Sequence, residues 1–322
     1  MMKLVWVLKK INSMDSSVFY SKILLFGEYG ILKNSNGLSM PYDQYSGRLK
    51  IGDLNIQKVV DSNSNLFEFY NYLTKKSEIK SLIKLERLFD DLKSGLFFES
   101  SIPTGYGVGS SGAIVAAIYE RYIRNEYKVL NKTKKNRISD LIKNFSLMES
   151  FFHGKSSGLD PLNSFMKLPI LINFNHGVQT TSLPIENTIG DGGIFIVDSG
   201  LNRNTESLVN LFFELMADKD VSNAFDKEFI YYTNKCVDNL LKSEFNELFM
   251  NTKKISKFIL ENFEFMIPKG FKNLWKKGIS SEDFILKPCG SGGGGFILGL
   301  SMDLNKAKSY FSKFSFKVVF SF

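Results

Sequence analysis

The sequence has few cysteines and no long apolar run. Cys236 and Cys289 are its only two cysteines, and their separation matches no metal-binding motif. A structural disulfide is therefore not expected, and a reducing, cytoplasmic setting is the simplest interpretation. The apolar stretch Leu4–Leu8 is too short for a secretory signal or a bilayer span. Met14 is an alternative to Met1 as the native start.

The net charge of +8 suits two classes of partner. A basic surface attracts nucleic acid or membranes, but it equally suits an enzyme whose substrates are anions. The densest basic run, Lys132–Arg137, contains no aromatic residue on which a base could stack. We interpret it as a solvated loop or helix end and expect neither a nucleic-acid nor a membrane partner.

Apolar periodicity predicts a mixed α and β chain of two domains. Helices are expected at Ile79–Leu92, Ser110–Asn125 and Ile138–Phe152, and strands at Ile23–Phe26 and Leu49–Val60. Further predicted helices and strands follow to the C-terminus. The polar segment 175–192 is the least regular part, so we place the boundary there, with domains at residues 1–185 and 186–322.

A glycine-rich loop lies between a predicted strand and a predicted helix, over Ile102–Ala113. Glycines let the backbone approach an anion, and the free N–H groups of the helix start point at it. Gly107, Gly109 and Gly112 also match the dinucleotide fingerprint G-x-G-x-x-G. The acidic residue expected about twenty positions later is absent, and no Lys follows as in a P-loop. A simple capped turn is the structural alternative.

Two carboxylates flank a second Ser/Gly-rich segment. Glu149 lies in the last turns of a predicted helix, and Asp160 follows eleven residues later in a tight loop. Phosphoryl transfer needs one carboxylate to hold magnesium and another to orient the acceptor hydroxyl. Surface carboxylates are an equally weighted alternative. We interpret His153 as a helix-end cap rather than a catalytic group.

A third glycine cluster, Lys287–Phe296, has four consecutive glycines between two apolar strands. Such a run costs conformational entropy, so a purely structural turn would rarely use it. We expect this loop to pack against a ligand or another loop.

Taken together, the three segments resemble the GHMP kinase family in order and spacing, from Ser21 to the C-terminus. The phosphate loop is similar to P-x-x-x-G-x-G-S-S-[GA], and the last cluster to G-[AS]-G-G-G-G. Ser21–Tyr29, His153–Asp160 and Asp198–Thr205 resemble segments of the mevalonate kinases. The implied fold is α+β, with an N-terminal domain like domain 2 of ribosomal protein S5 and a ferredoxin-like C-terminal domain.

The resemblance implies a role for each matching residue. Asp160 and Lys22 would be catalytic, while Glu149 and Ser111 would hold Mg²⁺. Glu28, Ser157 and Thr205 would lie on the acceptor side. ATP would be bound by two glycine loops, through Pro103, Gly105, Gly107, Gly109, Ser110, Ser111, Gly112, Gly292 and Gly293.

Four positions depart from the family pattern. They are Tyr29 for the usual His, Gly112 for Ala, Cys289 for Thr and Phe296 for Cys. The change at Tyr29 touches the acceptor side, so it bears on the choice of substrate more than on the choice of reaction.

The predicted function is therefore ATP-dependent phosphorylation of a small-molecule alcohol, and the primary alcohol of mevalonate is the first candidate acceptor. The alternatives are another acceptor of the family (phosphomevalonate, homoserine or a sugar) or a catalytically silent nucleotide-binding regulatory protein. The latter is expected to have lost Lys22, Glu149 or Asp160, and all three are present. The oligomeric state stays open, with a homodimer as one option.

Overall fold

The computed structural model describes residues 17–127, 137–184, 190–202 and 205–322. The predicted domain boundary at 185/186, Met14 and most of the basic run lie outside these ranges. The chain forms two compact units. Of the described residues, unit 1 comprises those in 17–21, Asp43–Ile102 and Gly109–Lys167. Unit 2 comprises Lys22–Tyr42, Pro103–Val108 and Leu168–Phe322.

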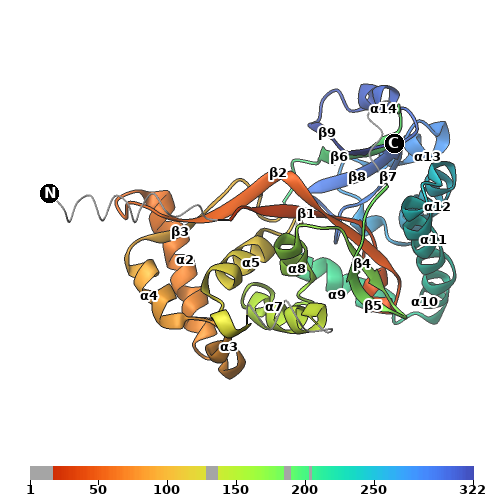
Figure 1. Cartoon of the computed structure of the whole chain (residues 1–322). Helices are drawn as coiled ribbons and strands as arrows, with labels where there is room; N and C mark the ends of the chain where they lie inside the picture. Colours follow the sequence, from red (N-terminus) through yellow and green to blue (C-terminus); the bar gives the residue numbers. More distant parts are fainter. Residues whose placement is uncertain (1–16, 128–136, 185–189, 203–204) are drawn as a thin grey trace. The chain divides into compact units, whose positions relative to one another are not determined.

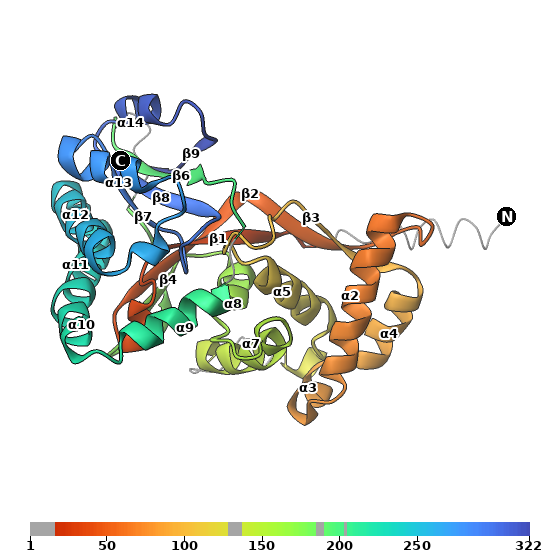
Figure 2. The same cartoon turned by 180° about the vertical axis from the view of Figure 1, so that it is seen from behind.

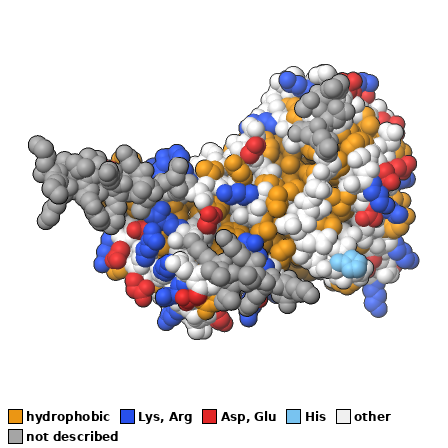
Figure 3. Space-filling view, viewed as in Figure 1, with side chains coloured by type: hydrophobic (Ala, Val, Ile, Leu, Met, Phe, Trp, Pro, Cys, Tyr) orange, Lys and Arg blue, Asp and Glu red, His pale blue; other side chains and the backbone are white. Residues whose placement is uncertain are grey.

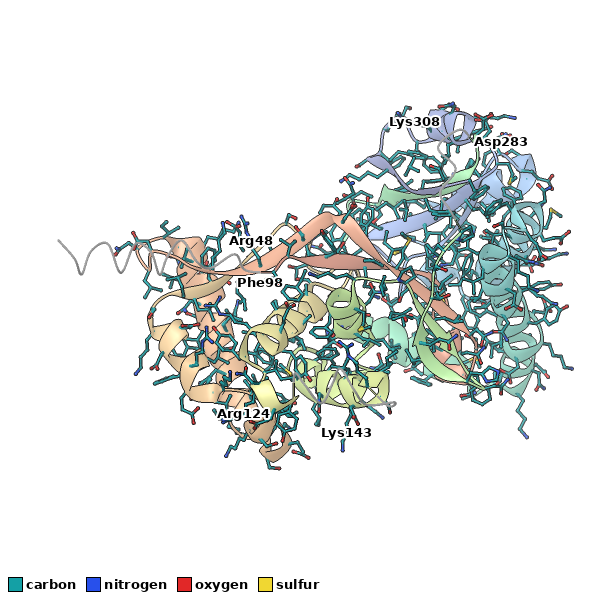
Figure 4. The ribbon with its side chains drawn as sticks, in the orientation of Figure 1. Arg48, Phe98, Arg124, Lys143, Asp283 and Lys308 are labelled. Atoms are coloured by element: carbon teal, nitrogen blue, oxygen red, sulfur yellow. The ribbon has the colours of Figure 1, made fainter. Side chains whose placement is uncertain are left out.

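Two long strands run through both units, β1 (Phe19–Phe26) and β2 (Gly37–Ile51). They belong to a five-stranded sheet with the order β1-β2-β4-β5, in which β3 also pairs with β2. In unit 1, β3 (Leu96–Ser100) runs antiparallel to the second half of β2, with Leu49 opposite Phe98. Figure 4 labels Arg48 and Phe98 on these two strands.

Unit 1 is mainly helical, and its helices gather on one side of the β2–β3 ribbon (Figures 1 and 2). The helices are α2 (Gln57–Leu73), α3 (Ser77–Leu82), α4 (Leu85–Lys93), α5 (Ser110–Tyr122), α7 (Arg137–His153) and α8 (Leu159–Met166).

A cluster of three aromatic rings joins α5, α7 and α8. The ring centroid of Tyr119 lies 4.9 Å from that of Phe145 and 5.6 Å from that of Phe165. The rings of Phe145 and Phe165 are 5.5 Å apart. Edge-to-face contacts of this kind stabilise the packing beyond the area that they bury. The cluster therefore fixes the three helices whose ends carry the predicted catalytic side chains.

In unit 2, β4 (Ile170–Asn173) pairs antiparallel with the first part of β2 and with β5 (Gly177–Thr180). A second, antiparallel sheet has the order β7-β8-β6-β9. Its strands are β6 (Gly193–Asp198), β7 (Ile285–Pro288), β8 (Phe296–Ser301) and β9 (Phe316–Ser321).

Helices and short turns complete unit 2, and α12 packs against β7 (Figure 2). They are η1 (Gly30–Lys33), α9 (Thr205–Leu215), α10 (Lys219–Ala224), the π-helical turn η2 (Phe225–Ile230), α11 (Tyr231–Leu241), α12 (Phe245–Asn262), η3 (Glu264–Met266), α13 (Lys272–Ser281) and α14 (Leu304–Tyr310).

Two sequence-based predictions are wrong in detail. The expected strand Leu49–Val60 ends at Ile51, and α2 begins at Gln57. The expected single helix Ile79–Leu92 is divided into α3 and α4. The division lies at Ile83, whose backbone forms an isolated bridge with Ile123. A tertiary contact of this kind leaves no periodic signal in the sequence.

Among the described residues, no helix combines the length and the apolar character that crossing a bilayer requires. On the face shown in Figure 3, acidic and basic side chains are interspersed.

Candidate active site

In unit 1, the carboxylate of Glu149 lies where α5, α7 and the loop before α8 meet. Its side chain is buried, and both carboxylate oxygens accept hydrogen bonds. The hydroxyl of Ser111 donates to Oε1 at 3.0 Å, and the hydroxyl of Ser156 donates to Oε2. Hydrogen bonds to an ionised carboxylate are about twice as strong as neutral ones. The orientation of this carboxylate is therefore set by its neighbours.

Asp160 is brought to the same region by the close approach of α8 to α5. A Cβ added to Gly112 would lie 2.6 Å from the carbonyl carbon of Asp160 and 2.9 Å from its Cβ. Only glycine therefore allows this separation without a shift of one helix. Ser111, next to Gly112 on α5, and Asp160, the second residue of α8, are brought to one region by this approach. The pair of carboxylates predicted from the sequence thus belongs to one helix junction.

His153 contributes to this junction as well. It is the last residue of α7, as expected for a helix-end residue, but its Nε2 also lies 3.0 Å from Oγ of Ser111. Which of the two atoms donates in this contact depends on the tautomer of the His153 ring. Sequence reasoning missed the contact. The i, i+4 spacing of Glu149 and His153 on one helix face is the signal that could have revealed it.

The oxygens of Glu149 and Ser111 suit a magnesium ion. Mg²⁺ prefers oxygen ligands and is commonly bound by one or two protein groups, with substrate phosphates and water completing the shell. A buried carboxylate in contact with a hydroxyl provides such a pair. Within the described part of the chain there is no group of three His, Cys, Asp or Glu side chains that could hold a metal ion. The oxygens of this pair are of the kind that Mg²⁺ shares with phosphates and water.

The phosphate-loop residues divide between the units. Gly109, in unit 1, is the N-cap residue of α5, with φ of 81°, and is followed by Ser110 and Ser111. Pro103, Gly105 and Gly107 belong to unit 2. Among the described residues, a Cβ at Gly105 would have one atom within 4 Å, Oδ1 of Asn202 at 3.8 Å. In unit 1, a helix start that directly follows a glycine can receive phosphate oxygens.

Lys22 lies on β1, where its backbone N–H donates to the carbonyl of Val108 at 2.8 Å. Its side chain is buried. This contact joins β1 to the end of the Pro103–Val108 segment within unit 2. The position of Lys22 is thus tied to the loop that precedes α5.

Glu28 forms a buried ion pair with Lys287 in unit 2. Nζ of Lys287 donates to Oε1 of Glu28 and, at 3.0 Å, to the carbonyl of Pro288. Burial raises the pKa of Glu28 above its ordinary value, and the charge of Lys287 opposes this rise. Lys287 also lies over the ring of Phe26, 5.3 Å from its centroid. In the sequence, Lys287 is the first residue of the third glycine cluster, and no role could be predicted for it because its partner is remote in the chain.

Tyr29 contacts the glycine cluster near the C-terminus. Its hydroxyl donates to the carbonyl of Ser291 at 2.8 Å, and its ring centroid lies 4.6 Å from that of Phe212. The side chain that replaces the family's usual His is thus engaged inside unit 2. Together with Glu28, it connects the turn after β1 to the 287–291 segment.

The glycine cluster packs against other loops of unit 2, as expected. The N–H of Gly293 donates to the carbonyl of Met266 at 2.8 Å, and that of Gly295 to Leu201 at 2.7 Å. A Cβ at Gly292 would meet the Met266 carbonyl oxygen at 2.5 Å. A Cβ at Gly295 would lie 2.9 Å from Cα of Tyr106. These close approaches explain why the segment requires glycine.

The remaining predicted residues complete the description. Ser157 is exposed, and its hydroxyl lies 3.4 Å from the backbone N of Leu159. Thr205 is the first residue of α9, but its side chain lies outside the described part of the structure. Unit 1 therefore brings together Ser111, Glu149 and Asp160, whereas Lys22, Glu28, Gly292 and Gly293 belong to unit 2.

No protein-family model and no curated protein sequence matches the chain. Solved structures do match. The mevalonate kinase of L. major in complex with R-mevalonate has a TM-score of 0.63 at 15% identity, over 92% of this chain and 90% of that chain. The galactokinase of Lactococcus lactis complexed with galactose has a TM-score of 0.63 at 14% identity, over 99% and 98%.

The phosphomevalonate kinase of Streptococcus pneumoniae, in complex with phosphomevalonate and AMPPNP, has a TM-score of 0.57 at 12% identity. It is matched over 92% of this chain and 94% of that chain. All three are GHMP kinases. The two antiparallel sheets and the match over nearly the whole chain confirm the predicted fold class: this chain has the fold of the GHMP kinases.

Proposed function

We propose that this protein is an ATP-dependent kinase that phosphorylates the hydroxyl group of a small molecule, with mevalonate as the first acceptor to test. One observation carries the proposal. The Ser111 hydroxyl lies 3.0 Å from the Glu149 carboxylate at the start of α5, where Gly112 also brings Asp160 close. The start of α5, directly after the glycine loop, thus has a hydroxyl and two carboxylates close to it. Phosphoryl transfer from ATP uses such groups to hold magnesium and to orient the acceptor hydroxyl.

The glycine loop and the start of α5 would bind the phosphates of ATP. Gly105, Gly107 and Gly109 have positive φ angles of 81°, 70° and 81°, a left-handed conformation that glycine adopts without strain and that occurs in anion-binding turns of the backbone. The N-terminal end of α5 adds the positive end of the helix dipole. The AMPPNP in the phosphomevalonate kinase complex supports a triphosphate nucleotide as the ligand of this fold.

Glu149 and Ser111 would hold Mg²⁺ with the nucleotide. The bound ion would supply positive charge that offsets the negative charge of the phosphates, with Glu149 and Ser111 as its protein ligands. Glu149 supplies a carboxylate whose orientation is set by two hydroxyl donors, and Ser111 supplies a neutral oxygen.

Asp160 would orient the acceptor hydroxyl and accept its proton. Because the transition state of phosphoryl transfer is largely dissociative, little proton removal is needed early, and an ordinary carboxylate suffices. Lys22 would offset negative charge on the transferring group. These two assignments rest on the resemblance of Ser21–Tyr29 and His153–Asp160 to the mevalonate kinases.

The choice of mevalonate also rests on those segments and not on the fold. The matched structures include kinases bound to mevalonate, galactose and phosphomevalonate, so the fold accommodates several acceptors. Ser157 and Thr205 would contact the acceptor, whereas the Glu28 carboxylate already has a partner in Lys287. Phosphomevalonate, homoserine and sugars remain alternative acceptors, and a silent nucleotide-binding regulator is the alternative from another class. We expect a cytoplasmic enzyme without nucleic-acid or membrane partners.

The decisive experiment is coupled ADP release with Mg-ATP against mevalonate, phosphomevalonate, homoserine and galactose. Turnover confined to mevalonate would establish the reaction and the acceptor. Turnover with another acceptor would retain the kinase and replace mevalonate. No turnover with any acceptor, together with measurable ATP binding, would favour the regulatory alternative.

A further inference from the structure

Ser156 is the residue through which the Glu149 carboxylate is connected to the helix that carries Asp160. Its hydroxyl donates to Oε2 of Glu149 and accepts the backbone N–H of Gly158 at 3.0 Å. Gly158 is the N-cap residue of α8, and Asp160 is the second residue of that helix. One hydroxyl therefore contacts both carboxylate-bearing elements of the junction.

The backbone of Ser156 is itself held in place by α7. Its carbonyl accepts a hydrogen bond from the hydroxyl of Ser146 at 2.6 Å. Gly158 approaches the same helix so closely that an added Cβ would lie 2.4 Å from the carbonyl oxygen of Ile142. The segment between α7 and α8 is thus held by the hydrogen bonds of Ser156 with Ser146 and Glu149 and by the close approach of Gly158 to α7. The Ser156 hydroxyl cannot rotate away without breaking these contacts.

The two carboxylate oxygens of Glu149 face different partners. Ser111, which we assign to the magnesium ion, contacts Oε1, and Ser156 contacts Oε2. A glutamate side chain loses several rotatable bonds when it is fixed, so a hydrogen bond that holds it before the cation arrives reduces the entropy lost on binding. Partners of metal-binding carboxylates act in this way in many proteins.

We propose that Ser156 is a positioning residue that holds the Glu149 carboxylate in the orientation required for a divalent cation and fixes the start of α8 relative to it. The inference rests on the proposed function, because it takes Glu149 as a ligand of the cation. Ser156 itself touches neither cation nor substrate. It acts through Glu149 on one side and through Gly158 on the other.

The test is binding of Mn²⁺ in the presence of AMPPNP, followed by the electron paramagnetic resonance signal of free Mn²⁺. The Ser156→Ala variant should bind Mn²⁺ about tenfold more weakly than the native protein, the lower end of the effect of losing such a partner. Ser156→Thr, which keeps a hydroxyl, should restore most of the affinity. The free energy of unfolding is measured for each variant by urea denaturation.

Ser150→Ala is the matched control. Ser150 is adjacent to Glu149 on α7, and its hydroxyl donates to the carbonyl of Ser146 at 2.7 Å. This variant also removes one hydroxyl near Glu149, but the Ser150 hydroxyl donates to a backbone carbonyl of α7 and not to the Glu149 carboxylate, so Mn²⁺ affinity should be unchanged. If Ser156→Ala does not fold, Ser156→Cys, a near-isosteric side chain with a weaker donor, should give an intermediate loss of affinity.

Each outcome decides the inference. Native Mn²⁺ affinity in folded Ser156→Ala or Ser156→Cys would overturn it while leaving the kinase proposal intact. An equal loss in Ser150→Ala would also overturn it, since the effect would then follow general loosening of α7. If the native protein binds neither Mn²⁺ nor AMPPNP, the proposed function fails first, and the role of Ser156 fails with it.

Discussion

In unit 2, Nζ of Lys287 donates to Oε1 of Glu28, and the two side chains are only 1% and 3% exposed. A buried ion pair of this kind contributes little net stability compared with two apolar side chains, but removal of one partner leaves an uncompensated charge. The pair also joins the turn after β1 to β7, directly before the consecutive glycines. Its integrity therefore matters for both segments.

Replacement of Lys287 with Met should lower the free energy of unfolding by about 3–5 kcal/mol near neutral pH, because Glu28 would remain buried without its counter-charge. Urea denaturation would measure the change. Lys272→Met is the control, since Lys272 forms a largely exposed ion pair with Glu264 and should have little effect. A loss no larger than that of the control would contradict this account.

The effect of Lys287→Met should also depend on pH. Burial raises the pKa of Glu28 above its ordinary value of 4.5. The contribution of Glu28 to stability is therefore greatest below about pH 4.5 and declines as pH rises through the pKa that Glu28 has in the folded protein. Without Lys287 this pKa rises further. The difference in unfolding free energy between native protein and variant should therefore be larger at about pH 8 than at about pH 4. A difference that shrinks with rising pH would refute the charge argument.

Gly112→Ala should disturb the junction of α5 and α8. The new Cβ would meet the backbone of Asp160 at 2.6 Å, so one helix must shift, at a cost of about 1–3 kcal/mol. We expect reduced stability in urea and, because Asp160 moves, reduced kcat. Native stability and kcat in Gly112→Ala would show that α8 adjusts freely.

Asp160→Asn should lower kcat by about 10²–10⁴-fold, the usual contribution of a positioned acid–base group. Nucleotide affinity should change little, because the phosphate loop is intact. Steady-state kinetics and calorimetric titration with AMPPNP would separate the two effects. Asp140→Asn, an exposed change in the first turn of α7, is the control. A near-normal kcat in Asp160→Asn would remove this residue from the proposed mechanism.

The two thiols should be unreactive in the folded protein. Cys236 and Cys289 are both buried, and burial raises the pKa of Cys236 to about 12. Because the thiolate is the nucleophile, attack on an aromatic disulfide reagent should be very slow in native buffer. Both thiols should react at once in concentrated urea. Rapid native labelling would indicate that the core of unit 2 opens.

Local patterns in the sequence were enough to predict the helices that carry the site. The stripes of α5 and α7 lie at helical spacing, and their observed bounds agree with the expected ones to within a few residues. The glycine loops are likewise short segments, and the resemblance of three such segments, in order and spacing, implied the fold class that the structure has. Strand β2 was largely missed, because its residues Gly37–Ile51 mix polar and apolar side chains without a clear alternation.

Contacts between remote residues came only from the tertiary structure. Ser111 and Glu149 are 38 positions apart, and Glu28 and Lys287 are 259 apart. Hydrophobic periodicity shows which face of an element is buried, but not which distant side chain lies opposite it. That pairing depends on how several helices and strands pack at once. Short segments of the sequence therefore determine which chemical groups this protein has available, whereas the folded chain alone determines the partners of Glu149 and Glu28.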